Sequence, residues 1–196
     1  ESTSPLRIVV IGSGAAALAA IEAIRLRNQA CSIKLITADS ALPYFRPSLI
    51  DLLSGELDDA EFYLHPADWY AEQKVDLLLG TTVESIDPKA RLVYPAQGEA
   101  IPYDRLIMAT GSHSTVPDIP GSTKVGSFTL RSLDDCRQIK EWAKTAQQAV
   151  VVGGGLLGLE AAWAFKKAGL KVTIIENDSR LLPLQLDSTG SALLED

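Results

Sequence analysis

One local plan occurs twice in this chain of 196 residues and constrains its fold more than any other feature. In each copy an apolar run of strand length leads into a glycine-rich turn, a helical segment and a second strand. The first copy covers residues 6–39 and the second covers residues 148–177. This order builds parallel sheets in which a dinucleotide pyrophosphate lies at the helix N-terminus. The repeat therefore predicts an α/β chain with two dinucleotide-binding units.

The first glycine-rich turn runs from Gly12 to Ala17. Gly12 permits the sharp turn out of the strand, and Gly14 has no side chain to keep a pyrophosphate from the backbone. Ala17 replaces the usual third glycine with a methyl group that still allows close packing of helix on strand. An acid after the second strand would bind a ribose. Ala38 occupies the first position to inspect and Asp39 the next, so we choose Asp39 while the register stays open.

The second turn, Gly153 to Gly158, is a full GxGxxG sequence. Glu176 follows the next strand, 18 residues after Gly158. A carboxylate there accepts hydrogen bonds from ribose hydroxyls and repels a 2′-phosphate, so NAD(H) is favoured over NADP(H). The predicted NAD(H) contacts are Gly153, Gly155, Leu156, Leu157, Gly158 and Glu176. One such turn is weak evidence, but two in matching contexts are hard to reach by chance.

The segment between the copies adds a rigid turn at Leu42–Pro47. Two prolines fix the backbone around Arg46, which directs this side chain either at the bound dinucleotide or, in the alternative reading, into solvent. Strand-like runs at residues 75–79, 82–86 and 91–94 predict a small antiparallel sheet. In that sheet Val83 lies where its backbone can meet adenine. A helix is predicted over residues 133–147, capped by Ser132 or Asp134.

Composition excludes several other classes of function. The formal net charge of −7 argues against nucleic acid or an anionic membrane as the main partner. The two cysteines, Cys31 and Cys136, fit neither a metal-ligand nor a CxxC spacing, so we predict no metal site and two buried thiols. No run approaches the roughly 20 apolar residues of a membrane span. We therefore expect a cytoplasmic protein.

These segments resemble the pyridine nucleotide–disulfide oxidoreductase superfamily of flavoproteins. The motifs that carry the resemblance lie at residues 12–17, 42–47, 103–112, 119–121, 130–131 and 153–160. Within the superfamily the chain is most similar to NADH-dependent rubredoxin or ferredoxin reductases and to the flavin-binding part of NADH nitrite reductases. The segment at residues 182–187 is reminiscent of the nitrite reductase group.

The resemblance implies two Rossmann-like three-layer folds with a small antiparallel sheet. Residues 1–115 would form an FAD-binding domain, and residues 116–196 the incomplete start of an NAD(H)-binding domain, so we expect a truncated chain. The implied FAD contacts are Gly12, Ser13, Gly14, Ala15, Ala16, Thr37, Ala38, Asp39, Arg46, Pro47, Val83, Ala109, Thr110, Gly111 and Arg131. Glu160 in the family points toward the contact between flavin and nicotinamide; the alternative is an ordinary helix-surface carboxylate.

The implied function is an oxidoreductase that passes electrons from NADH through FAD to an acceptor such as an iron protein or a nitrite-reducing centre. Disulfide-reducing branches carry redox cysteines at about residues 43–55, where this chain has none, so we expect no dithiol chemistry. Two alternatives stay open. One is an NADH oxidase that uses oxygen directly, and the other is a non-catalytic dinucleotide-binding module. The sequence leaves the electron acceptor and the oligomeric state undetermined.

Overall fold

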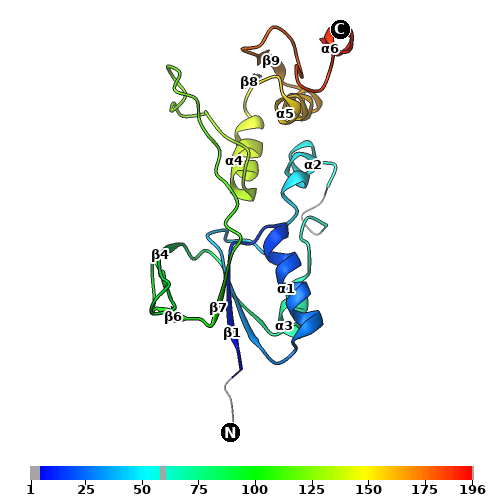
Figure 1. Ribbon diagram of the computed structural model, residues 1–196. Helices are drawn as coiled ribbons and strands as arrows, with labels where there is room; N and C mark the ends of the chain where they lie inside the picture. Colours follow the sequence, from blue (N-terminus) through cyan, green and yellow to red (C-terminus); the bar gives the residue numbers. More distant parts are fainter. Residues whose placement is uncertain (1–4, 58–60, 196) are drawn as a thin grey trace. The chain divides into compact units, whose positions relative to one another are not determined.

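The computed structural model describes residues 5–57 and 61–195 (Figure 1). Their Cα atoms group into two compact units. The first unit contains the described residues of 5–46 and 61–113, and the second contains those of 47–57 and 114–195.

The first unit is built on a four-stranded parallel sheet. Its strands are β1 (Arg7–Ile11), β2 (Ser32–Ile36), β3 (Val75–Leu78) and β7 (Arg105–Met108), in the spatial order β3-β2-β1-β7. Successive side chains of β1 point to opposite faces, and both faces are buried: Val9 is 2% exposed and Val10 is 0% exposed. This explains the unbroken apolar run in the sequence, because parallel strands are normally covered on both sides.

Different elements cover the two faces of this sheet. The helices α1 (Ala15–Arg27) and α3 (Ala67–Glu72) pack Leu18, Ile21 and Tyr70 against Ile8 and Val10. On the other face lies an antiparallel sheet of β4 (Val83–Asp87), β5 (Leu92–Pro95) and β6 (Ile101–Pro102). The predicted three-layer arrangement with a small antiparallel sheet is therefore present in the first unit (Figure 1).

One strand does not lie where we expected it. The run at residues 75–79 was predicted next to the antiparallel strands, but β3 pairs in parallel with β2, from Ile33 opposite Val75 to Ile36 opposite Leu78. The physical reason is α3, which makes the β2–β3 connection a crossover and so returns the chain in the same direction. The antiparallel sheet takes β6 as its third strand instead.

The second unit contains β8 (Gln148–Val152) and β9 (Lys171–Ile175), which pair in parallel, and α5 (Leu156–Lys167) between them in sequence. Its remaining helices are α2 (Leu49–Ser54), α4 (Leu133–Ala143) and α6 (Ser188–Glu195), and the 3-10 turn η1 (Arg46–Ser48) precedes α2. Lys140 Nζ donates to the Leu52 carbonyl oxygen at 3.0 Å, which fixes α4 to α2. The buried Cys136 thiol lies 3.7 Å from the Leu49 carbonyl oxygen.

Helix α4 begins as predicted and ends early. Ser132 is its N-cap, and a capping box joins its hydroxyl to the Asp135 amide at 3.1 Å. The helix was predicted to reach residue 147, but it ends at Ala143, where the Lys144 amide bonds to the Glu141 carbonyl oxygen and tightens the last turn. Across residues 5–57 and 61–195, no helix is long and apolar enough to cross a membrane.

Candidate functional site

The first glycine-rich turn leaves no room for a side chain at Gly12. Its φ of 108° lies in the region that favours glycine, and an added Cβ would lie 2.1 Å from the Ala109 carbonyl oxygen. The Ala109 amide in turn donates to the Ile11 carbonyl oxygen at 2.8 Å. The segment that continues through Thr110 and Gly111 therefore leaves β7 directly beside this turn, and its role toward FAD stays a prediction.

The start of α1 presents unpaired amides to open space. Gly14 is the N-cap residue and makes no side-chain capping bond, and nothing lies within 4 Å of the position its Cβ would take. The first amides of a helix lack partners within the helix. Ala15 and Ala16 are exposed, whereas the Ala17 methyl is fully buried against the core. This geometry fits a pyrophosphate, which helix N-termini bind through such amides.

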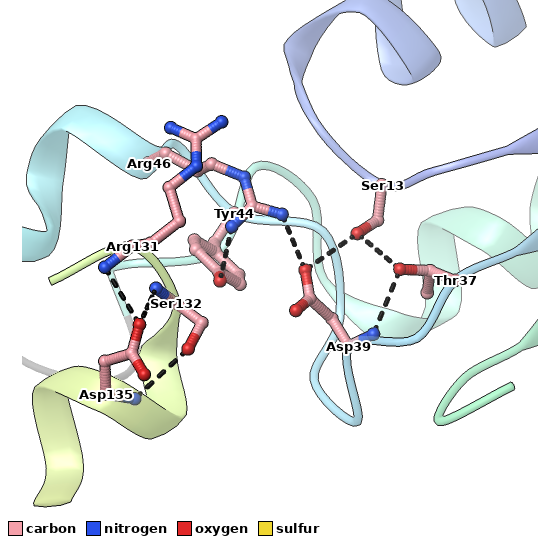
Figure 2. A network of polar contacts seen from close by, with 8 residues as sticks. All are labelled: Ser13, Thr37, Asp39, Tyr44, Arg46, Arg131, Ser132 and Asp135. Carbon is pink, nitrogen blue, oxygen red and sulfur yellow. Dashed lines mark hydrogen bonds and ion pairs between the residues drawn. The ribbon is translucent and has the colours of Figure 1, made fainter. Parts of the chain in front are cut away.

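A polar network joins this turn to the end of β2 (Figure 2). The buried Ser13 Oγ lies 2.9 Å from Thr37 Oγ1 and donates to Asp39 Oδ2 at 3.2 Å. The Asp39 amide donates to Thr37 Oγ1 at 3.2 Å, which fixes the bend after the strand. Ala38 is exposed and has only a methyl group. Of the two positions left open by the sequence, Asp39 is the one whose carboxylate lies at the turn.

Arg46 belongs to the same network (Figure 2). Its Nη2 donates to Asp39 Oδ2 at 2.8 Å, and its Nη1 donates to the Tyr44 hydroxyl at 3.2 Å. The guanidinium carbon also lies 5.2 Å from the centre of the Tyr44 ring, which stacks on Phe62 with 4.6 Å between ring centres. The turn therefore holds Arg46 in place before any ligand binds, and Pro47 follows it as the second residue of η1.

Backbone hydrogen bonds bring the predicted adenine contact close to the acid in the fold. The Thr81 amide donates to the Thr37 carbonyl oxygen at 2.7 Å, and the Gly80 amide donates to the Asp39 carbonyl oxygen at 2.9 Å. Val83, the first residue of β4, follows two residues later and is half-buried. An adenosine whose ribose meets Asp39 would thus find Val83 nearby, although this role stays a prediction.

Arg131 lies in the second unit, before α4. Its amide donates to Asp135 Oδ2 at 2.9 Å, and the same oxygen accepts from the Ser132 amide (Figure 2). The capping box thereby fixes the backbone of Arg131, while the role of its side chain toward FAD stays a prediction.

The second turn repeats the geometry of the first. Gly153 has a φ of 112°, and a Cβ on Gly158 would lie 2.0 Å from the Gly153 carbonyl oxygen, so both positions require glycine. Gly155 caps α5 without a side-chain bond and has nothing within 4 Å of its Cβ position. Leu156 and Leu157 are exposed at the helix start. The turn fits a second pyrophosphate by the same argument as the first.

Glu176 is held at this second turn by main-chain amides. Its Oε2 accepts from the Gly154 amide and its Oε1 accepts from the Asp178 amide at 2.8 Å. These bonds, that of Asp178 first, lower the pKa of the Glu176 carboxyl, so the carboxylate is kept ionised. A Cβ on Gly154 would lie 2.5 Å from Leu181 Cδ2 and 3.0 Å from Glu176 Oε2. We did not predict a role for Gly154, although the run of three glycines was a visible signal.

Glu160 lies elsewhere on α5. It is half-buried in the wall of an open apolar hollow of about 580 Å³, together with Trp163, Ile174 and Leu194. Its predicted place at the contact between flavin and nicotinamide stays a prediction. Within the described residues, no group of three or more His, Cys, Asp or Glu side chains could hold a metal ion.

Comparison with known proteins decides the family. The family model described as "Pyridine nucleotide-disulphide oxidoreductase" matches residues 6–196. The chain belongs to this family. The resemblance inferred from its motifs is therefore confirmed.

Individual proteins of this family are also similar to the chain. The chain is 36% identical, over 89% of its length, to the ferredoxin reductase component of chlorobenzene dioxygenase from Cupriavidus sp. (strain PS12), of which it covers 43%. It is 34% identical, over 96% of its length, to the assimilatory nitrate reductase electron transfer subunit of Bacillus subtilis (strain 168), of which it covers 25%. The crystal structure of NADH:rubredoxin oxidoreductase from Clostridium acetobutylicum matches with a TM-score of 0.87 at 31% identity, covering 97% of this chain and 49% of that one. The chain thus spans between a quarter and a half of these three proteins.

Proposed function

We propose that this chain carries the FAD-binding and NAD(H)-binding turns of a flavoprotein reductase, which passes electrons from NADH through FAD to an iron protein or to a nitrite-reducing centre. The observation that carries the proposal is the duplicated turn. At Gly14 and again at Gly155, an uncapped helix N-terminus faces open space beside an acid that follows the next strand. One chain with two such turns is suited to hold two dinucleotides.

The first turn is assigned to FAD. Ser13 to Ala16 would bind the pyrophosphate through main-chain amides, and Thr37 to Asp39 would meet the ribose. Arg46 would add a positive charge beside the phosphates, and the Ala109–Gly111 segment would close the site. Bound FAD would supply the hydride acceptor and the onward electron donor, so the protein itself needs to supply position and electrostatics rather than a general base.

The second turn is assigned to NAD(H). Glu176 would accept hydrogen bonds from the adenosine ribose hydroxyls, and its fixed negative charge would repel the 2′-phosphate of NADP(H). Both carboxylate oxygens are anchored by main-chain amides, so the side chain cannot easily swing away from a phosphate. This favours discrimination by charge.

The acceptor is inferred from the relatives. The protein from Cupriavidus is named a ferredoxin reductase component, that from Clostridium a rubredoxin oxidoreductase, and that from Bacillus an electron transfer subunit of nitrate reductase. An iron protein or the next redox centre of a larger enzyme is therefore the kind of partner that we propose.

The first experiment is an absorbance spectrum of the purified protein with and without added FAD. A visible flavin band that survives gel filtration supports the proposal. A folded, colourless protein that does not retain FAD would overturn it and would favour the non-catalytic dinucleotide-binding module.

The second experiment follows bleaching of the flavin band by NADH in the full-length protein, using stopped-flow mixing. We expect bleaching by NADH, then rapid reoxidation by ferredoxin or rubredoxin and slow reoxidation by oxygen. Oxygen as the fastest acceptor would replace the proposed activity with an NADH oxidase.

A further inference from the structure

The two carboxylate oxygens of Asp39 have different surroundings. Oδ2 accepts from Ser13 Oγ at 3.2 Å and from Arg46 Nη2 at 2.8 Å (Figure 2). Among the residues that the structure describes, none donates a hydrogen bond to Asp39 Oδ1. Thus one oxygen is engaged by the protein and the other remains able to accept a bond from a ligand hydroxyl.

Asp39 Oδ2 lies where an unpaired negative charge would weaken the binding of a pyrophosphate. Ser13 is the second residue of the turn assigned to a pyrophosphate, and its hydroxyl touches the carboxylate directly. The side chains of Asp39 and Arg46 are only 22% and 28% exposed, so water screens this charge incompletely. An unpaired carboxylate here would repel the incoming phosphates, whereas the Arg46 guanidinium neutralises it.

The arginine is itself held from a second side. Arg46 donates to the Tyr44 hydroxyl and lies near the Tyr44 ring. Tyr44 stacks on Phe62, and both of these aromatic residues are only 2% exposed. The Asp39 carboxylate and the buried Tyr44–Phe62 pair therefore fix the Arg46 guanidinium. Asp39 also accepts a hydrogen bond from Ser13 and so links the guanidinium to the pyrophosphate turn. When a long side chain is already ordered before the ligand binds, less conformational entropy is lost on binding.

We propose that Asp39 is a positioning residue as well as a ribose ligand: Oδ2 holds Arg46 and Ser13 at the pyrophosphate turn, and Oδ1 is left for the ribose of FAD. The inference rests on the proposed function, because it takes FAD as the ligand. It goes further in assigning the acid a second task, which is to orient and balance the arginine that serves the phosphates.

The test is a double-mutant cycle on FAD affinity with Asp39→Asn, Arg46→Met and the double variant. Arg46→Met leaves an unbalanced carboxylate at the phosphate turn, so we expect it to be the worst of the three, with a loss of about a hundredfold. In the double variant that carboxylate is gone, and we expect at least about tenfold of the loss to be recovered relative to additive behaviour. Arg46→Lys, which keeps the charge without the planar fork, should fall between wild type and Arg46→Met.

A comparison of ADP affinity with adenosine affinity separates a role toward the phosphates from a purely structural role. Arg46→Met should weaken ADP binding much more than adenosine binding, because only ADP carries phosphates. A purely structural role would lower both affinities by the same factor. The matched control is the exposed pair of Lys34 and Asp76, which joins β2 to β3 in the same unit; Lys34→Met and Asp76→Asn should change FAD affinity by less than about twofold.

Two failures can be told apart. If wild type binds FAD but the losses of Asp39→Asn and Arg46→Met simply add, the inference is overturned and the proposed function stands. If wild type does not bind FAD, the proposed function falls and this inference falls with it. Unfolding temperatures of the same four proteins without ligand then still report whether the Asp39–Arg46 pair is coupled.

Discussion

At the scale of single residues, much of the candidate site is defined by missing side chains. Gly12, Gly154 and Gly158 each face a backbone or side-chain atom within 2.5 Å of the position a Cβ would take. Gly14 and Gly155 instead face open space. Gly12 and Gly158 meet backbone oxygens and are needed for the fold, whereas Gly154 meets the flexible end of the Leu181 side chain. Gly14 and Gly155 are free to serve a ligand.

This division predicts opposite results for two neighbouring substitutions. Gly12→Ala should destabilise the protein by roughly 2–4 kcal/mol, because the methyl group meets the Ala109 carbonyl oxygen and the φ of 108° is strained for alanine. Gly14→Ala should change the free energy of unfolding by less than about 1 kcal/mol and should weaken FAD binding instead. Urea unfolding and FAD titration measure the two effects. Equal loss of stability in both variants would contradict the division.

Glu176 gives a second prediction at this scale. Replacing it with glutamine removes the charge but keeps the size, so the preference for NADH over NADPH should fall by about tenfold or more. Since its pKa is lowered, the carboxyl is ionised at and above its ordinary pKa. The 2′-phosphate of NADP(H), with a second pKa of about 6, is also fully ionised above neutral pH, so the preference of wild type should be flat from about pH 7 to 8.5. Dissociation constants of both nucleotides at three pH values check this. A preference that disappears near neutral pH would argue that Glu176 does not set it.

At the scale of elements, the strands, turns and helices that depend on neighbouring residues could be predicted from the sequence. Both glycine-rich turns and their flanking strands and helices lie within the predicted ranges, residues 6–39 and 148–177, because β-branched runs, glycines and caps act locally. The sheet to which β3 belongs was predicted wrongly, since a short apolar strand carries no mark of its partner. The contacts of Asp39 with Ser13 and Arg46 could not be predicted either, because they depend on how the turn and the end of β2 fold together. That Asp39 binds the ribose stays a prediction.

A salt bridge between elements gives the pH-dependent prediction. Arg7 at the start of β1 donates to Asp104 before β7, from its side chain at 2.9 Å and its amide at 2.8 Å. These bonds lower the pKa of Asp104 from 3.8 to about 2. A carboxyl with a lowered pKa stabilises the fold above its unfolded pKa, and that stability is lost as pH falls. Unfolding should become easier between about pH 4 and pH 2, and Asp104→Asn should show less of this change in urea melts at each pH.

At the scale of the whole molecule, the two units repeat one plan with unequal burial. In the first unit both faces of the parallel sheet are covered, and every residue of β1 from Ile8 to Ile11 is at most 7% exposed. In the second unit Val150, Val152 and Ile175 are more than half exposed on β8 and β9. Both units have the local signals for a dinucleotide turn, but among the residues that the structure describes, only those of the first unit cover their sheet on both faces.

For a protein of these 196 residues, the difference predicts that the two sheets open independently. Amides buried under packed side chains exchange with solvent only when the surrounding structure opens, so burial on both faces should protect β1 and β2 more than β8 and β9. Hydrogen exchange followed by mass spectrometry should show slow exchange in residues 7–11 and 32–36 and faster exchange in residues 148–152 and 171–175. Because a ligand that binds the folded state stabilises it, FAD should slow the first pair further, and NADH should slow the second. Equal protection of both sheets, or a response of both to either nucleotide alone, would mean that the units open as one body.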